Sequence, residues 1–127
     1  MNVRYEGFFI QEALQSKLFR DIEYKHVTTE YKPLKTHEEL YGQKATFLIV
    51  GYGNDSVNEG FQVKLAYCES DELRELFNAI PIPHITLSVS EEGKPVNTAN
   101  LEFHPIGNPA TVTGIFGGFL NKPILTV

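Results

Sequence analysis

The sequence predicts a single α+β domain in which most of the sheet is antiparallel. At 127 residues the chain has the length of one domain, and its hydrophobic content of 42% is enough for a core. About seven segments have the composition or alternation of strands, whereas only two have the spacing of a true helix. The strands and helices do not alternate regularly, which argues against repeated strand-helix-strand crossovers in one parallel sheet.

The strands are predicted from β-branched and aromatic content, from alternation, and from the turn residues that bound them. They are expected at residues 3–10, 24–32, 45–53, 61–68, 84–90, 97–105 and 110–120. Pro33 ends the second of these, because proline cannot continue a ladder of hydrogen bonds. The segment GNDSVNEG separates the third from the fourth, and EEGKP follows the fifth. Both segments are turn sequences.

The two helices are predicted from apolar residues at helical spacing. Over residues 11–22 these are Ala13, Leu14, Leu18 and Ile22. Over residues 70–80 they are Leu73, Leu76, Phe77 and Ile80. Ser70 is the expected N-cap of the second helix, and two acidic residues follow it where the helix dipole favours them. Residues 36–41, THEELY, contain a capping-box pattern and predict one further helical turn.

The charge and composition limit the classes of partner. The net charge is −5, and no cluster of Lys and Arg supplies the basic stripe that long nucleic acid requires. A local positive pocket for a small anion remains compatible with an acidic protein. The chain has one cysteine, Cys68, so it forms no internal disulfide, which favours a reducing compartment. Cys68 is expected to be a small buried residue near a strand end.

No segment is typical of a membrane protein or a secreted one. The N-terminal residues MNVRYEGFFI are too short and too polar for a signal peptide. No apolar run approaches the roughly 20 residues of a membrane span. We therefore expect a soluble, cytoplasmic protein without a membrane partner.

Two blocks of the sequence are similar to one another. The first consists of EGFFI, the predicted helix 11–22 and KHVTTEY; the second consists of FQVKLAY, the predicted helix 70–80 and PHITLSV. Each closing strand carries a His-x-Thr motif, at His26 and at His84. Such a repeat predicts two lobes related by a pseudo-twofold axis, with the two closing strands facing each other across a groove.

Alternation along each closing strand divides its side chains between the groove and the core. The residues expected to face the groove are His26, Thr28 and Glu30 on the first strand and His84, Thr86 and Ser88 on the second. The residues expected to face the core are Val27, Tyr31, Ile85, Leu87 and Val89.

On these two motifs, HVT at 26–28 and HIT at 84–86, the sequence resembles the two-histidine (2H) phosphoesterase superfamily. The superfamily includes cyclic phosphodiesterases, RNA ligase-like and other RNA-end-processing enzymes, and viral enzymes that destroy nucleotide second messengers. The resemblance implies a bilobal fold with duplicated strand-helix-strand units around a central groove. It also implies a phosphodiesterase that needs no metal. Histidine-triad hydrolases do not fit, because residues 86 and 88 are Thr and Ser.

The residue types suit this chemistry. Two histidines can serve as general base and general acid, because their pKa of about 6.5 lies near neutrality. Thr28 and Thr86 can each donate a hydrogen bond to a phosphate oxygen. The sequence does not say which histidine is the acid and which is the base.

Three further residues are candidates for substrate binding. Tyr5 could stack on a base, Glu30 could orient a histidine or bind a ribose hydroxyl, and Ser88 continues the groove face. No metal site is expected, since motifs such as CxxC and HExxH are absent from the sequence, and no cofactor is expected either.

Two functions therefore remain open. The preferred one is a hydrolase that cleaves a small nucleotide: a 2′,3′-cyclic phosphate, a 2′–5′ linkage or a cyclic oligonucleotide. The short chain would also suit a phage enzyme that degrades a nucleotide immune signal. The alternative is a non-catalytic protein that sequesters a nucleotide in the same groove. The partner in either case is a small nucleotide or a short oligonucleotide, and the oligomeric state stays open.

Overall fold

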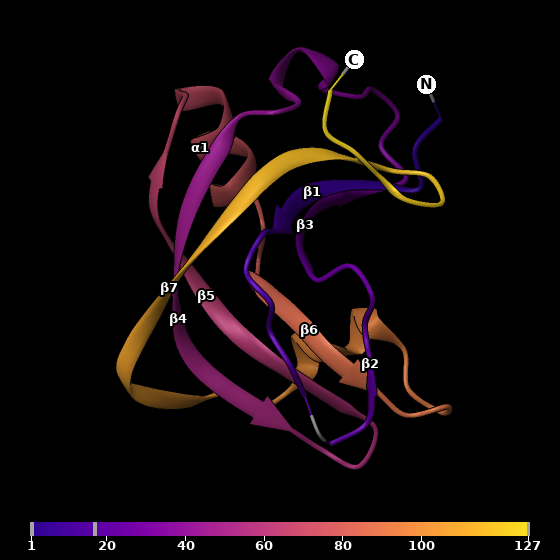
Figure 1. Cartoon of the computed structure of the whole chain (residues 1–127), viewed down its shortest axis with the longest axis vertical. Helices are drawn as coiled ribbons and strands as arrows, with labels where there is room; N and C mark the ends of the chain where they lie inside the picture. Colours follow the sequence, from indigo (N-terminus) through magenta and orange to yellow (C-terminus); the bar gives the residue numbers. More distant parts are fainter. Residues whose placement is uncertain (1, 17, 127) are drawn as a thin grey trace.

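In the computed structural model, which describes residues 2–16 and 18–126, eight strands form one antiparallel sheet (Figure 1). The strands are β1 (Tyr5–Ile10), β2 (Arg20–Asp21), β3 (His26–Tyr31), β4 (Lys44–Asn54), β5 (Asn58–Cys68), β6 (His84–Val89), β7 (His104–Phe119) and β8 (Pro123–Ile124). The helical elements are α1 (Asp71–Asn78) and two 3₁₀ segments, η1 (Glu38–Leu40) and η2 (Pro95–Asn100). The predicted α+β class with a largely antiparallel sheet is confirmed.

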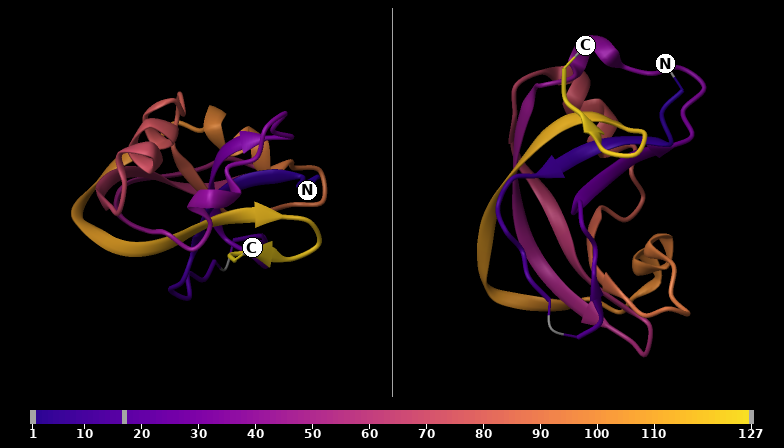
Figure 2. Two further views of the ribbon diagram at one scale, coloured as in Figure 1. Left: turned by 90° about the horizontal axis from the view of Figure 1, so that it is seen from above. Right: turned by 45° about the vertical axis from the view of Figure 1, so that its right-hand side comes forward.

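The sheet curls so that its two ends approach each other. The strand order is β2-β6-β5-β4-β7-β1-β3, and β8 pairs with the end of β7. In Figure 1 the long strands β4, β5 and β7 run along the left side, and β1, β3 and β6 turn toward the right. The views in Figure 2 show the same curvature. As a result Cα atoms of β3 and β6 come within 8 Å, although no ladder joins these strands.

Phenylalanines from three strands occupy the concave interior. Phe8 packs edge-to-face on Phe47 and on Phe116, with ring centroids 5.0 and 5.4 Å apart. All three side chains are fully buried. Phe77 of α1 packs on Phe47 at 5.7 Å, so α1 covers one end of this core. Burial of large aromatic rings stabilises such a sheet strongly, because each ring removes much apolar area from water.

The α1 helix agrees with the prediction over residues 70–80. The Ser70 hydroxyl caps it by accepting from the Leu73 N–H at 3.3 Å. Leu73 and Phe77 are its buried residues. The capping box predicted over residues 36–41 yields only the 3₁₀ segment η1, whose N-cap, His37, has no side-chain cap.

The helix predicted over residues 11–22 is wrong. The described residues there form no helix, and Lys17 lies outside the described residues. None of them is buried: Leu14 is half-buried against the core, but Ala13 and Leu18 are exposed, so the segment has no continuous buried face that a helix would need. An isolated helix of this length is marginal without such packing. The backbone instead bonds to other segments: Gln11 N–H donates to Thr113 O at 2.9 Å, and Ile22 N–H to Leu87 O at 3.0 Å.

The strand predicted over residues 97–105 is also wrong. Most of this segment belongs to η2 and to the loop that leads into β7. Thr98 is fully buried in η2, where its hydroxyl bonds to Asn58 and Thr86. These side-chain bonds hold the segment in a compact turn. Within the described residues no helix combines the length and the apolar character that crossing a membrane requires.

Candidate functional site

Both His-x-Thr motifs line one groove between the two ends of the curled sheet. The groove has a volume of about 800 Å³. Its lining includes His26 and Thr28 from β3 and His84 and Thr86 from β6. The curvature of the sheet thus brings residues 58 positions apart in the sequence to one concave surface. The alternation of side chains predicted that these two histidines and two threonines would face a groove.

The two histidines are held in the same way. The Nδ1 atom of His26 lies 2.8 Å from the Tyr24 carbonyl oxygen, and that of His84 lies 2.8 Å from the Ile82 carbonyl oxygen. A carbonyl oxygen only accepts, so each Nδ1 carries a hydrogen and donates it. The neutral rings therefore leave Nε2 as the basic atom. Neither Nε2 has a hydrogen-bond partner among the described residues.

The surroundings of His26 include an aromatic group. Tyr5 stacks on its ring with centroids 4.5 Å apart and planes 21° apart, and Phe9 lies at 5.8 Å. The Tyr5 hydroxyl is 3.4 Å from Nδ1. Burial lowers the pKa of His26 below 6.5; the Tyr24 carbonyl opposes this shift, and a positive charge on His84 adds to it. The neutral form of His26 is thus favoured, and the two rings are close enough to influence each other.

Glu30 does not line the groove, contrary to the expected alternation. In the β1–β3 ladder Gly7 pairs with Thr28 and Glu6 with Glu30, so Thr29 is an extra residue, a β-bulge. The bulge reverses the faces beyond it. Glu30 therefore shares the face of Glu6, while Tyr31, which was expected in the core, is 61% exposed and lines the groove.

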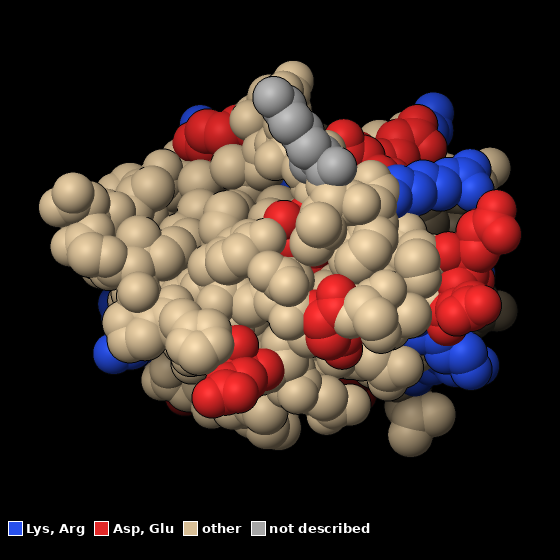
Figure 3. All heavy atoms as spheres, turned by 90° about the horizontal axis from the view of Figure 1, so that it is seen from below, with Lys and Arg blue, Asp and Glu red and all other residues tan. Residues whose placement is uncertain are grey.

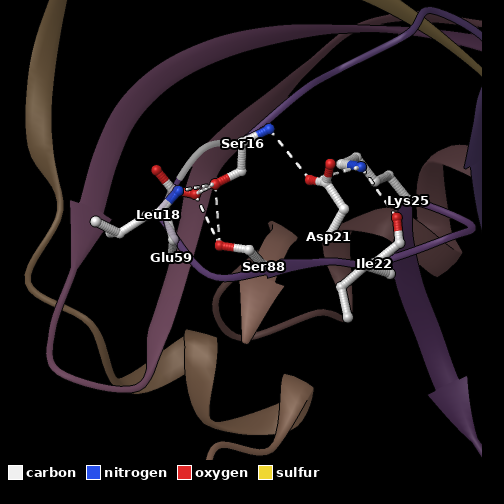
Figure 4. Close-up of polar contacts among 7 residues, drawn as sticks. All are labelled: Ser16, Leu18, Asp21, Ile22, Lys25, Glu59 and Ser88. Atoms are coloured by element: carbon white, nitrogen blue, oxygen red, sulfur yellow. Dashed lines mark hydrogen bonds and ion pairs between the residues drawn. The ribbon is translucent and has the colours of Figure 1, made fainter. Parts of the chain in front are cut away.

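Ser88 is displaced by a second bulge of the same kind. Gly60 pairs with Thr86 and Glu59 with Ser88, which leaves Leu87 as the extra residue of β6. Ser88 is fully buried, and its hydroxyl donates to Glu59 at 2.9 Å. Figure 4 shows Ser16, Glu59 and Ser88 joined in one cluster. None of these three residues lines the groove. Ser88 therefore supports the sheet and is not placed to contact a ligand in the groove.

The two threonines differ in how much of their hydrogen-bonding capacity is free. The Thr86 hydroxyl lies 3.0 Å from Pro95 O and 2.8 Å from Thr98 Oγ1, and its single hydrogen is used within this network. The Thr28 hydroxyl forms no hydrogen bond with any described residue. Only Thr28 can donate to a ligand without first breaking an internal bond.

Several groove residues were not predicted from the sequence. The groove also contains the cations Arg4 and Lys94, the single acid Glu23, and a set of aromatic and aliphatic side chains. Neither Arg4 nor Lys94 forms an ion pair with a described residue. With two cations against one acid, the groove is locally positive on a protein of net charge −5.

A sequence signal for two of these residues was available. Tyr24 and Ile82 each stand two positions before a motif histidine, and their carbonyls orient the two rings. Alignment of the two sequence blocks on their motif histidines would have placed Tyr24 and Ile82 at equivalent positions. Arg4 and Lys94 lie before β1 and at the start of η2, where no local pattern marks them.

The surface seen from below is largely uncharged. Figure 3 shows tan atoms over most of this face, with Asp and Glu scattered among them and Lys and Arg toward its edges. On this face the described side chains form no continuous basic stripe.

One group of potential metal ligands occurs among the described residues, and it lies outside the groove. Glu6, Glu30 and His37 offer ligand atoms within 4.8 Å of one another. The Glu6 carboxylate already accepts from the His37 N–H at 2.7 Å, from His37 Nδ1 at 2.8 Å and from the Tyr41 hydroxyl at 2.8 Å. These bonds account for the cluster as a buried anchor of the loop before η1.

Comparison of the sequence with protein-family models finds no match, and comparison with curated proteins finds no similar sequence.

Proposed function

We propose that the protein is a metal-independent phosphodiesterase that hydrolyses a small nucleotide by two-histidine general acid–base catalysis. The observation that carries the proposal is the matched geometry of His26 and His84 in one groove. Each ring donates Nδ1–H to the carbonyl two residues earlier, so each presents Nε2 for proton transfer. Two such groups are what a metal-free cleavage of a phosphodiester requires.

The reaction needs a base and an acid at the two ends of an in-line displacement. One Nε2 takes the proton of the attacking water as its oxygen bonds to phosphorus. The other histidine, protonated at Nε2, gives that proton to the oxygen that leaves. Thr28 can donate to a non-bridging oxygen, and Arg4 and Lys94 can offset its charge.

We assign His26 as the base and His84 as the acid. A base must be unprotonated before the reaction, and burial against Tyr5 lowers the pKa of His26. A protonated His84 lowers it further, so the state with His26 neutral and His84 charged is mutually consistent.

We also infer that the fold contains a duplicated unit with approximate twofold symmetry. Residues 7–9 pair with 26–28 in the same register in which residues 60–62 pair with 84–86. Both units begin Glu-Gly-Phe, and both closing strands have a bulge one residue after the threonine. The repeat lies in these strand pairs; among the described residues, a helix joins the paired strands only in the second unit.

The first prediction concerns turnover by the unmodified protein. Incubated with EDTA, it should cleave at least one class among 2′,3′-cyclic mononucleotides, 2′–5′ oligoadenylates and cyclic di- and trinucleotides, with products separated by mass. Among the described residues, no cluster of three or more potential metal ligands lies in the groove, so EDTA should not change the rate. Binding without turnover would favour the sequestering alternative, and loss of activity with EDTA would contradict the proposal.

The second prediction concerns pH. The acidic limb of kcat/KM reports the base of the free enzyme, so its midpoint should lie below 6.5, because the pKa of His26 is lowered. Tyr5→Ala should move this midpoint upward, since it exposes His26 to water. Tyr5→Phe keeps the stacked ring and serves as the matched control, with the midpoint unchanged. A wild-type acidic limb above 6.5 would contradict the assignment of His26.

The third prediction separates the two threonines. Thr28→Val should lower kcat/KM by about 10- to 100-fold with little change in stability, because it removes a free donor. Thr86→Val should lower the free energy of unfolding by about 1–3 kcal/mol, because it removes the hydroxyl that bonds to Pro95 O and Thr98 Oγ1 in a buried network. Turnover and urea denaturation of both variants provide the measurement. A large loss of stability in Thr28→Val but not in Thr86→Val would contradict the assignment of Thr28 as the ligand-binding threonine and Thr86 as the structural one.

A further inference from the structure

The groove has two chemically different walls, one beside His26 and the other beside His84. The aromatic wall consists of Tyr5, Tyr24, Tyr31 and Phe119 on and around β1, β3 and the end of β7. The aliphatic wall consists of Ile82, Pro95 and Val96, at the start of β6 and in η2. In the aromatic wall Tyr5 stacks on Tyr31 at 6.0 Å and on Phe119 at 5.0 Å, so its members form one continuous surface.

Both walls expose large apolar side chains toward the groove. Tyr24 and Tyr31 are 36% and 61% exposed, and Ile82 and Val96 are 41% and 66% exposed. Tyr24 and Ile82 hold equivalent places, each two residues before a motif histidine. Exposed apolar side chains gathered in one concavity mark a ligand site, and here such side chains lie beside each of the two histidines.

Each wall also carries one cation. Arg4 adjoins Tyr5, and its charge acts on the Tyr5 hydroxyl. Lys94 adjoins Pro95, whose carbonyl accepts the Thr86 hydroxyl. Neither forms an ion pair with a described residue, so both charges are available to a ligand anion.

We propose that the groove binds a substrate with two nucleosides, one against each wall, and with a phosphate beyond the scissile one. This proposal rests on the proposed function of the same groove. A single nucleoside with a cyclic phosphate would leave one wall and one cation unused. A dinucleotide or a small cyclic oligonucleotide would place a base on the aromatic wall and a second nucleoside on the aliphatic wall. Its additional phosphate would meet Arg4 or Lys94.

The test is calorimetric binding to the His84→Asn chain, which stops the proposed turnover without touching either wall. The probes are the 2′–5′ and 3′–5′ dinucleoside monophosphates of adenosine and guanosine, the same molecules with a 5′-phosphate, and the 2′,3′-cyclic mononucleotides. The 5′-phosphorylated dinucleotide of at least one series should bind about tenfold more tightly than the cyclic mononucleotide of the same base. That ratio corresponds to about 1.4 kcal/mol.

Wall variants then locate the two nucleosides. Tyr31→Ala should weaken dinucleotide binding about tenfold or more, since stacking on an aromatic side chain is lost. Val96→Ser should weaken it by a smaller factor of about three, by the loss of apolar contact. Both side chains are exposed, so folding should be unaffected, and the melting temperature checks this. The cyclic mononucleotide should respond to only one of the two variants. Tyr67→Ala, which is exposed outside the groove, is the matched control.

Charge variants locate the additional phosphate. Either Arg4→Gln or Lys94→Gln should remove the advantage of the 5′-phosphorylated probe over the unphosphorylated one, whereas Lys64→Gln, exposed outside the groove, should preserve it. Equal affinity for mononucleotide and dinucleotide, or no binding of any dinucleotide, would overturn the proposal. Because binding is measured without turnover, these results stay separate from failure of the catalytic proposal, which the turnover panel reports.

Discussion

Replacing either His26 or His84 by asparagine is expected to reduce turnover by about 10²- to 10⁴-fold, the usual contribution of a positioned acid or base. Asparagine keeps an N–H donor near the position of Nδ1, so the bond to the Tyr24 or Ile82 carbonyl can be retained. It lacks an atom equivalent to Nε2. The substitution therefore removes proton transfer while preserving the local hydrogen bond.

The measurement is kcat/KM on whichever substrate the turnover panel identifies, together with the melting temperature of each variant. His104→Asn is the matched control, because His104 is exposed on β7 outside the groove. The double variant should lose little more than either single variant, since acid and base act as a unit. Turnover within a factor of two or three of the wild-type value in both single variants would contradict the proposed mechanism.

The pH profile adds a separate criterion for the roles of the two histidines. If His26 is the base, His26→Asn should remove the acidic limb, and His84→Asn should remove the basic limb. The pH dependence of the residual activity of each variant shows whether the acidic or the basic limb of the profile is lost. If His26→Asn instead removed the basic limb and His84→Asn the acidic limb, the two-histidine mechanism would stand. The assignment of His26 as the base, which its burial supports, would then be reversed.

The sequence was informative where a periodic pattern extends over a whole buried element. Strict alternation in residues 84–87 correctly placed His84 and Thr86 on the groove face of the strand and Ile85 on the core face. In the first motif, His26 and Thr28 likewise line the groove and Val27 is buried. The α1 helix was predicted together with its Ser70 cap. In each case the local pattern and the tertiary environment favour the same conformation, which is when local reasoning succeeds.

Alternation failed at the bulges, because one inserted residue reverses every side chain beyond it. The two misplaced residues, Glu30 and Ser88, occupy the same position in their respective strands, two residues after the motif threonine. The same reversal brought Tyr31 into the groove. The glycines opposite the bulges, in the repeated Glu-Gly-Phe segments, were a signal that could have revealed both.

The remaining errors come from tertiary contacts that no local window contains. Residues 11–22 have helical spacing, but Ala13 and Leu18 are exposed and Leu14 is only half-buried against the core. The backbone of the segment bonds to β7 and β6 instead. Thr98 was read as part of a strand, yet its hydroxyl joins Asn58 and Thr86 in a buried network. Arg4 and Lys94 join the groove only because the sheet curls.

Adding a single methyl group at Gly7 or Gly60 is expected to lower the free energy of unfolding by about 1–3 kcal/mol, the usual range for overpacking a close contact. A Cβ at Gly7 would lie 2.3 Å from the Val27 carbonyl oxygen. A Cβ at Gly60 would lie 2.7 Å from the Ile85 carbonyl oxygen and 2.3 Å from Thr98 Cγ2. Both carbonyls belong to the central residue of a His-x-Thr motif, and backbone atoms in a paired strand cannot turn aside as a flexible side chain can.

Gly107→Ala is the matched control, because a Cβ there meets nothing within 4 Å, and its effect should stay within about 0.5 kcal/mol. Urea denaturation of the three variants gives the comparison. Where Gly7→Ala remains folded, turnover should still fall, because displacing Val27 O moves His26 and Thr28 on either side of it. A misplacement of about 1 Å can reduce the rate 10²-fold. A Gly7→Ala protein as stable and as active as the Gly107→Ala protein would mean that the bulge does not set the position of the histidine.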